Sequence, residues 1–510
     1  MRPLELALLL TTLLAVTRPW VARTAGPGIV IGAAMVPVAV AVTQVLVESG
    51  RWQLAPLWLA VAVIVVLAAR DMWTQERPRY VAAGASVATL AVVGGALLWA
   101  LPVLELRAPD GRFAVGTTTM VVTDESRMEV YGPDPGGLRQ LPVQVWYPAE
   151  VGEGGQPARW LQGRSAVTTA AAREAGLPGF ALDHLELVVS NAVTDAPIAD
   201  GGPFPVVLYA HGWQGFRDIH ISQLESLASE GYVVAAADHT YGALATLLPG
   251  DVIAELDPAA LPSGVSASEY DAASTQLVAT FADDLALVLE SVLDGRAFGT
   301  LLAAPTVANG DAAGEDDPDE RTAPDTAEVG RPLPDLEETV DPDRIALIGH
   351  STGGGAAYLL CSRDTRCSAA VAYDPWLEPV PDEVVGGAFD RPLLSIGSEE
   401  WDGNDNDVRV RRLHAGATAA EGRVRIAGTL HRDLTQLPAL SPAASWLGLA
   451  GPTSAETTLS LLDRWTVGFL DHHLVGRGRD PLRDENRDER VRVDVNDPDS
   501  ENGRDTQDNS

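Results

Sequence analysis

The 510-residue sequence contains no lysine, so all 36 basic residues are arginines, and 70 acidic residues outnumber them. The formal net charge at pH 7 is therefore −34. A protein that binds nucleic acid needs a basic face to neutralise phosphates. We therefore expect no nucleic-acid partner.

Cysteine is nearly absent as well, with Cys361 and Cys367 the two examples. Two thiols are too few for a disulfide-rich scaffold or a four-thiolate metal site, and no second ligand pair stands near them in the sequence. We therefore predict no metal site. The even number still permits one disulfide, if the compartment allows it.

The acidic excess is unevenly distributed along the chain. Residues 1–109 contain eight arginines and five acidic residues, a net charge of +3, so residues 110–510 carry −37. Hydrophobic residues make up 46% of the sequence, which excludes a wholly disordered chain. The asymmetry predicts two regions of different character rather than one large core.

Charged residues are missing from three long runs in the first region: Thr24–Val47, Trp52–Ala69 and Val81–Leu104. Each is near or above the roughly 18–20 residues that cross the hydrocarbon core of a membrane. A shorter run, Leu6–Thr17, fits either a fourth helix with snorkelling flanks or a signal peptide, and we favour the helix. Residues 1–109 are thus predicted to be a transmembrane anchor region, with no ionisable residue inside the long runs to support transport.

Arginines between these runs predict the orientation, because positively charged loops stay in the cytoplasm. The first and third gaps hold most of them: Arg18, Arg23, Arg70, Arg77 and Arg79. Placing those gaps inside puts the chain beyond Leu104 outside, in a multi-pass protein of the cell membrane. A cytoplasmic C-terminal region is the alternative.

After residue 110 the pattern changes to short apolar strands that alternate with helical segments. Continuous apolar runs are typical of parallel strands covered on both faces. The predicted fold is therefore a mostly parallel, doubly wound α/β sheet. The strands are expected at Gly116–Thr123, Leu141–Tyr147, Pro205–Ala210, Tyr232–Ala237, Arg344–Ile348, Ala369–Tyr373, Pro392–Ile396 and Arg423–Ile426.

Two segments are predicted to lie outside this core, which spans 110–476. Residues 309–341 are acidic, proline-rich and without periodicity, so we expect a disordered surface insertion. Residues 477–510 alternate acidic residues and arginines without apolar anchors, so we expect a disordered charged tail.

Gly349-His350-Ser351-Thr352-Gly353 follows a buried strand and precedes a helix rich in small residues. A serine presented on such a sharp turn needs glycine two positions to either side, because side chains there would collide with the neighbouring strand and helix. This G-x-S-x-G pattern predicts that Ser351 is a nucleophile. An oxyanion hole would then combine the amide of Thr352 with that of Trp213, which follows a strand and a His211-Gly212 pair.

The acid and the base of a serine hydrolase should follow later strands. Asp374 leaves a buried apolar strand, and we favour it over Glu399, Glu400 and Asp402, which follow the next strand. His431 lies on a loop after the last predicted strand and is the expected base. His472 and His473 are adjacent on a helix, so we expect them on different faces, as a polar helix end rather than metal ligands.

Residues 111–475 resemble the α/β-hydrolases of the platelet-activating factor acetylhydrolase type. The segments that carry this resemblance are Trp146-Tyr147-Pro148, His211-Gly212, the elbow around Ser351, Asp374-Pro375-Trp376 and Gly428-x-x-His431. In that family the acid follows the strand just after the elbow, which supports Asp374. Thr352 stands where members commonly carry a bulkier phenylalanine.

The resemblance implies a serine esterase that needs no cofactor and cleaves short or oxidised acyl chains from phospholipid-like esters. A broad carboxylesterase, lipase or polyester hydrolase is the enzymatic alternative, and a catalytically silent surface binding protein is another. With the region beyond Leu104 outside, we expect Cys361 and Cys367 to form a disulfide rather than remain two buried thiols.

Overall fold

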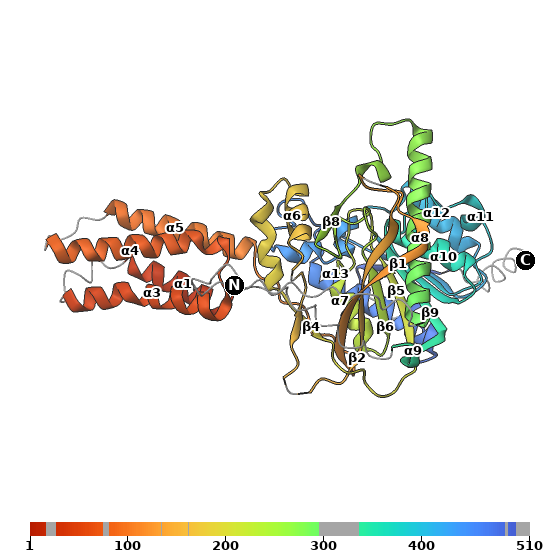
Figure 1. Cartoon of the computed structure of the whole chain (residues 1–510), viewed down its shortest axis with the longest axis horizontal. Helices are drawn as coiled ribbons and strands as arrows, with labels where there is room; N and C mark the ends of the chain where they lie inside the picture. Colours follow the sequence, from red (N-terminus) through yellow and green to blue (C-terminus); the bar gives the residue numbers. More distant parts are fainter. Residues whose placement is uncertain are drawn as a thin grey trace, which may run out of the picture.

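A computed structural model describes residues 1–16, 27–74, 81–133, 135–152, 154–161, 163–294, 336–484 and 488–495. A helical bundle lies at one end of the molecule and an α/β domain at the other (Figure 1). The bundle consists of α1 Pro3–Ala15, α3 Pro27–Glu48, α4 Ala55–Thr74 and α5 Val81–Ala100. The short helix η1, Trp52–Leu54, precedes α4.

Three helices of the bundle are long and apolar enough to cross a membrane, with spans at Ile31–Glu48, Trp52–Arg70 and Ala83–Ala100. α4 has 20 residues and is therefore about 30 Å long, which matches the hydrocarbon thickness. The run predicted as a fourth helix forms α1, whose Leu8 is fully buried in a cluster with residues of α4 and α5. With 13 residues, α1 is shorter than a complete span.

The α/β domain is built on a sheet that has eleven strands within the described residues, in the order β13-β12-β11-β10-β9-β5-β6-β2-β1-β4-β3. Neighbours from β12 to β6 are parallel, while β13, β2 and β3 each join antiparallel. All eight predicted strands are present. The bounds are β1 Ala114–Met128, β2 Leu138–Ala149, β3 Pro157–Arg159, β4 Val189–Thr194, β5 Phe204–Ala210, β6 Val233–Ala237, β9 Val340–His350, β10 Cys367–Tyr373, β11 Leu393–Ser398, β12 Glu421–Ile426 and β13 Val491–Asp494.

Helices cover both faces of the sheet, which is why its central strands are apolar throughout: every residue of β5 is buried. α8 Ala267–Asp294 and α10 Thr352–Arg363 pack on one face. α7 Ile221–Ser229 and α13 Ala455–Leu470 pack on the other. The predicted doubly wound α/β fold is confirmed.

Shorter elements complete the domain. They are α6 Ser165–Glu174, η2 Gly179–Leu187, η3 Pro258–Ala260, α9 Leu336–Thr339, α11 Asp382–Val385, α12 Asp405–Ala415, η4 His431–Leu434, η5 Leu437–Leu440, the π-helix η6 Asp471–Val475 and η7 Pro481–Arg483. A hairpin, β7 Ala245–Leu248 and β8 Val252–Glu255, turns through Gly250 and Asp251, both with positive φ.

The predicted disordered tail is wrong for its first part. β13 pairs with β12 at the sheet edge, and the Leu482 side chain of η7 is 4% exposed. Apolar contacts come from two valines of β13, which alternate with charged residues, and from Leu482. The high charge of this segment led to the prediction that it has no apolar anchors. Of the predicted insertion, residues 309–335 lie outside the described residues, whereas Leu336–Asp341 belong to α9 and the start of β9.

Candidate active site

Ser351 lies at the sharp turn between β9 and α10, in a backbone conformation that side chains seldom adopt, with φ +55°. The flanking glycines are required by close backbone approach. A Cβ on Gly349 would lie 2.1 Å from the carbonyl oxygen of Gly353, and one on Gly353 would lie 2.2 Å from that of Ala210. The G-x-S-x-G pattern therefore forms a strand-to-helix elbow that presents the serine.

Asp374 follows β10, the neighbour of β9, and meets His431 from the loop after β12. The His431 Nδ1–H donates to Asp374 Oδ2 at 3.0 Å, with Asp374 3% exposed. Ser398 holds the carboxylate from the other side, because its hydroxyl donates to Oδ2 at 2.5 Å and its amide donates to Oδ1 at 2.9 Å. The acid is thus fixed in one orientation toward the imidazole.

The three rival carboxylates make other contacts. The amide of Gly428 donates to Glu399 Oε2 at 2.6 Å, and the amide of His431 donates to Glu400 Oε2 at 2.6 Å. Asp402 lies 3.4 Å from the guanidinium of Arg425. Glu399 and Glu400 therefore hold the backbone of the His431 loop, while Asp374 contacts the ring.

The His431 ring is also stacked between two other rings. Trp401 lies parallel to it, with centroids 4.2 Å apart and planes at 2°, and His350 lies at 4.5 Å and 26°. Burial lowers the pKa of His350 well below its ordinary value, so this neighbour is neutral. The sequence analysis did not predict a role for Trp401. Its position between the rival acids Glu400 and Asp402 could have pointed to it.

The predicted oxyanion residues come together beside the elbow. The amide of Trp213 donates to the Thr352 side-chain hydroxyl at 3.4 Å, and Thr352 is 1% exposed. Gly212 passes close to Ser351, since a Cβ on Gly212 would lie 3.0 Å from the serine Cβ. Trp213 and Thr352 thus lie beside Ser351, with the Trp213 amide directed at the Thr352 hydroxyl.

His211 controls the direction of the Trp213 amide. Its Nε2 accepts the amide proton of His239 at 3.0 Å, so the ring proton is on Nδ1, which donates to the Gly212 carbonyl at 2.7 Å. In a trans peptide the N–H points opposite to the carbonyl. His211, together with the Gly215 amide that donates to the same carbonyl at 2.9 Å, therefore directs the Trp213 N–H to the opposite side. Burial lowers the pKa of His211 to about 3 and keeps its ring neutral.

A buried ionic network lies behind this loop. His239 Nδ1 is 3.0 Å from Asp284, and the guanidinium of Arg139 bridges Asp284 and Glu129, each at 2.7 Å. Burial alone would raise the pKa of Asp284, but Arg139 outweighs it and the pKa lies below its ordinary value. The network therefore stays ionised and ties α8 to β2.

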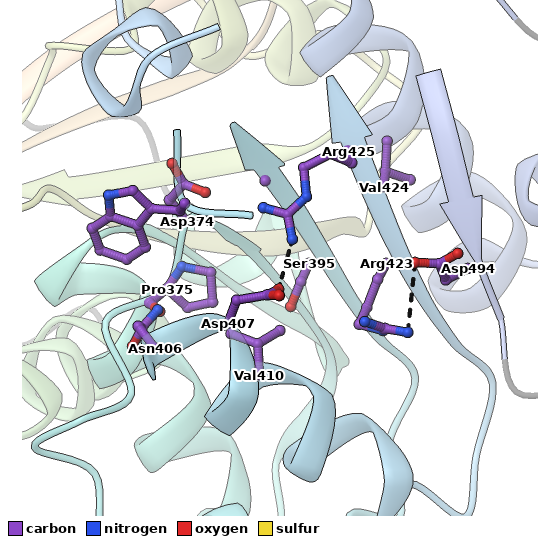
Figure 2. Close-up of a pocket in the computed structure, with 12 residues that line it drawn as sticks. Asp374, Pro375, Ser395, Asn406, Asp407, Val410, Arg423, Val424, Arg425 and Asp494 are labelled. Carbon is purple, nitrogen blue, oxygen red and sulfur yellow. Dashed lines mark hydrogen bonds and ion pairs between the residues drawn. The ribbon is translucent and has the colours of Figure 1, made fainter. Parts of the chain in front are cut away.

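A cavity adjoins the outer side of the acid (Figure 2). Of the predicted site residues, Asp374 lines it, and its remaining wall is mostly polar. Arg425 and Asp407 form an ion pair of 2.6 Å there. Apolar groups line the cavity as well, among them the Trp401 ring that stacks on His431.

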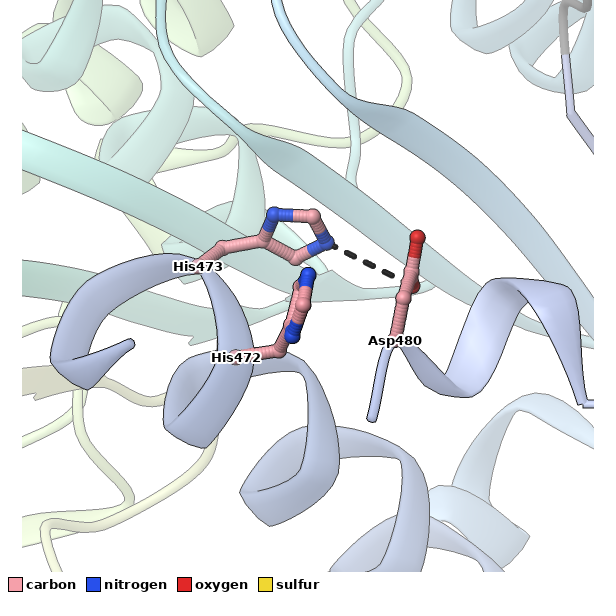
Figure 3. Close-up of side chains that lie close together, drawn as sticks. All are labelled: His472, His473 and Asp480. Carbon is pink, nitrogen blue, oxygen red and sulfur yellow. Dashed lines mark ion pairs between the residues drawn. The ribbon is translucent and has the colours of Figure 1, made fainter. Parts of the chain in front are cut away.

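His472, His473 and Asp480 form a second cluster of metal-ligand types, far from the elbow in sequence (Figure 3). The two rings are in contact, with centroids 4.7 Å apart, so the expectation of different faces is wrong: the π-helix η6 brings them together. His473 Nε2 lies 3.5 Å from Asp480 Oδ1, and the three ligand atoms lie within 4.8 Å of one another. Asp480 already caps η7 by accepting the amide proton of Leu482 at 3.0 Å. The cluster is therefore best explained as a polar tie at the end of α13.

The structure joins Cys361 and Cys367 in a disulfide. Cys361 lies near the end of α10 and Cys367 begins β10, so the bridge connects the helix behind Ser351 to the strand that leads to Asp374.

Comparisons with known proteins decide the family. A family model described as platelet-activating factor acetylhydrolase, isoform II, matches residues 104–258 and 324–487, more than half of the chain. The chain belongs to this family. The matched segments begin after α5, so the bundle lies outside them.

Two relatives and one solved structure illustrate the similarity. Platelet-activating factor acetylhydrolase of Bos taurus is 26% identical over 289 residues, which is 56% of this chain and 61% of the bovine protein. That of Cavia porcellus is 22% identical over 375 residues, covering 72% of this chain and 77% of the relative. A ferulic acid esterase from Streptomyces cinnamoneus superposes with a TM-score of 0.57 and 25% identity, over 77% of this chain and 99% of the esterase.

The chain therefore spans less than two thirds of the bovine relative's length. The esterase confirms the α/β-hydrolase fold, and its whole length is matched. Family and structural neighbour together support a carboxylic ester hydrolase.

Proposed function

We propose that the protein is a membrane-anchored serine esterase with Ser351 as nucleophile, His431 as base and Asp374 as the acid that orients the base. The observation that carries this proposal is the 3.0 Å contact between Asp374 and His431 Nδ1, beside a serine on a strand-to-helix elbow. Because Nδ1 carries the proton shared with Asp374, Nε2 is left free to accept the proton of the serine hydroxyl.

In the acylation step, the Ser351 oxygen attacks the ester carbonyl carbon as its proton passes to His431 Nε2. The carbonyl electron pair moves to the oxygen, and the amides of Trp213 and Thr352 stabilise that oxyanion. When the intermediate collapses, the bond to the alcohol breaks and the imidazolium returns its proton to the leaving oxygen.

Water completes the cycle by the same route. His431 takes a proton from the water as its oxygen attacks the acyl carbon, and the intermediate then releases the carboxylic acid and regenerates Ser351. Asp374 orients His431 and stabilises the imidazolium. Every role in this scheme is supplied by the chain's own side chains and amides.

Hydrolysis of p-nitrophenyl acetate by the purified full chain in detergent tests the proposal. We expect turnover that is lost in Ser351→Ala, together with covalent labelling of the wild-type serine by a fluorophosphonate. Equal rates for both proteins would refute it and favour a binding protein that keeps the fold.

For the substrate we propose phospholipid-like esters with short or oxidised acyl chains, because the matched relatives are platelet-activating factor acetylhydrolases. The ferulic acid esterase neighbour supports a second candidate, a broader carboxylesterase that accepts aromatic esters. Initial rates on a matched panel of acetyl and oxidised-acyl phosphatidylcholines and methyl ferulate separate the two. Faster turnover of the phenolic ester would overturn the lipid assignment.

We also propose that the bundle spans the cell membrane with the hydrolase outside. The apolar helices support spanning, and the 92% exposed Trp73 stands near the end of α4 away from the hydrolase, as interfacial tryptophans do. At the hydrolase end, Arg2 and Arg51 are both paired with Glu5, at 2.7 and 2.8 Å, whereas the opposite connections are rich in arginine. A membrane-impermeant fluorophosphonate should therefore label Ser351 in intact cells, and labelling only after lysis would reverse the orientation.

A further inference from the structure

We propose that the helical bundle is more than an anchor: its docked end supports the loops that carry the oxyanion amide and the catalytic base, so that turnover depends on this interface. The inference rests on the proposed serine esterase function. It starts from contacts between the bundle and the hydrolase that a flexible tether would not make.

Side chains at the start of α4 bind the hydrolase directly. The Trp52 indole N–H donates to the carbonyl of Ala181 in η2 at 3.1 Å, and its ring meets the edge of Phe180 at 5.5 Å. Gln53 Nε2 and His184 Nδ1 lie 2.9 Å apart, with the two residues 0% and 2% exposed. Separating the domains would leave these buried polar groups to find new partners, which makes the docking specific.

The connector between bundle and hydrolase is partly buried in the same place. Together with Trp52 it packs on an apolar cluster of η2, α6 and the loop after β5, rather than crossing solvent. The connector residues in this cluster are Leu101, Val103, Leu104 and Leu106. The bundle end and the hydrolase therefore share one continuous core.

That core reaches the oxyanion loop, because Phe216 and Ile219, three and six residues after Trp213, belong to the same cluster and are 2% and 5% exposed. Trp160 adds a polar tie, since its indole N–H donates to the carbonyl of Asp218 at 2.9 Å. Arg164 holds the Asp218 carboxylate at 2.5 Å. The stretch after Trp213 is thus fixed on the side that faces the bundle.

The core also reaches the segment that follows His431. Leu440 of η5 packs on the cluster, and the amide of Gln436 donates to the carbonyl of Ile219 at 3.0 Å, which joins this segment to the oxyanion loop. Further along, Trp446 contacts Trp99 at the end of α5, with ring centroids 5.5 Å apart. The two loops that flank Ser351 are therefore held by one apolar cluster, which Trp52 and the connector cover at the bundle end.

The test uses the full-length protein in detergent and a water-soluble ester, so that a change in turnover reports on the docked interface and not on the membrane. In Trp52→Ala we expect kcat to fall about three- to tenfold with KM little changed, the scale of a coupling carried through packed side chains. Amide exchange in peptides covering 211–221 should become faster at the same time. Trp73→Ala is the matched control, because it removes the same side chain from the other end of α4.

Trp52→Phe keeps the ring and loses the hydrogen bond, so a smaller change in the same direction is expected even if the alanine variant fails to fold. The proposal would be overturned if Trp52→Phe, and Trp52→Ala where it folds, kept the wild-type kcat and the wild-type amide exchange. It would also be overturned if Trp73→Ala lost as much kcat as Trp52→Ala. Failure of the proposed function is distinguishable, because hydrolysis would then persist in Ser351→Ala while exchange still reports on the docking.

Discussion

Replacing Asp374 by asparagine tests the assignment of the acid most directly. The amide of Ser398 donates to Oδ1, which forces the oxygen of an asparagine to that side and turns its NH2 toward His431 Nδ1. Two donors would then face each other, and the imidazole would relieve the clash by moving its proton to Nε2. In that tautomer His431 cannot accept the proton of Ser351.

The expected loss in kcat is about 10⁴-fold, equivalent to roughly 5.5 kcal/mol of transition-state stabilisation. The fold should survive, because the substitution is isosteric and the Ser398 amide keeps its partner. Stopped assays with p-nitrophenyl acetate at pH 7.5, with circular dichroism on the same samples, measure both quantities.

Glu399→Gln and Glu400→Gln are the matched controls, because they change rival carboxylates that bind the amides of Gly428 and His431. Each keeps an acceptor oxygen, so we expect losses of less than about tenfold. If Asp374→Asn retained a tenth of wild-type activity while Glu400→Gln lost a thousandfold, the geometry would have been assigned to the wrong acid.

Three further predictions follow from single contacts. His211→Ala removes one of the two donors to the Gly212 carbonyl and leaves the Gly215 amide, so kcat should fall about threefold in steady-state assays with KM unchanged. His211→Asn, which can still donate to that carbonyl, should recover part of the loss, and equal kcat values for both variants and wild type would contradict the positioning role. Leu447, 67% exposed and next to the Trp446 that contacts the bundle, should contact lipid, so Leu447→Ser should lower hydrolysis of vesicle-borne ester about tenfold and leave the soluble ester unaffected. A loss on both substrates would indicate a structural defect instead. Burial raises the pKa of Asp463 to about 8, so the folded state keeps a proton that the unfolded chain releases near pH 4. The free energy of unfolding therefore falls as the pH rises between these two values. Thermal melts of Asp463→Asn should show about 1–2 kcal/mol more stability than wild type at pH 8 and a flatter pH dependence, and equal pH dependences of the two proteins would contradict the assignment.

Local patterns predicted the central strands and the elbow because each is a property of neighbouring residues. A continuous apolar run such as β5 reflects burial on both faces. Glycine is required at 349 and 353 because a Cβ at either position would lie about 2 Å from a backbone carbonyl oxygen. Chain order along a doubly wound sheet then sufficed to propose Asp374 and His431, since the ends of adjacent parallel strands lie side by side.

Contacts between segments that are distant in the sequence could not be predicted from local patterns. Trp401 stacks on His431 from the loop that contains the rival acids Glu399, Glu400 and Asp402. The residues next to Trp401 in the sequence do not indicate which ring it contacts. β13 has four residues, two of them charged, and becomes a strand because the edge of β12 offers unpaired backbone groups. Its assignment as a disordered tail was wrong for that reason: composition describes a segment alone, and pairing depends on what lies beside it.

The same distinction bears on how the two regions of the chain are related. Composition separates a slightly basic, apolar head from a strongly acidic remainder, and this suggests an anchor joined to an independent enzyme. The contacts of Trp52 and Gln53 with η2 show instead that the boundary in composition is not a boundary in packing. Because the shared cluster includes Phe216 and Leu440, one from each loop beside Ser351, cutting the chain at the change in composition would remove a wall of the core that supports the site. Catalytic competence should therefore be measured on the full chain, in which Trp52 and the connector keep their contacts with this cluster.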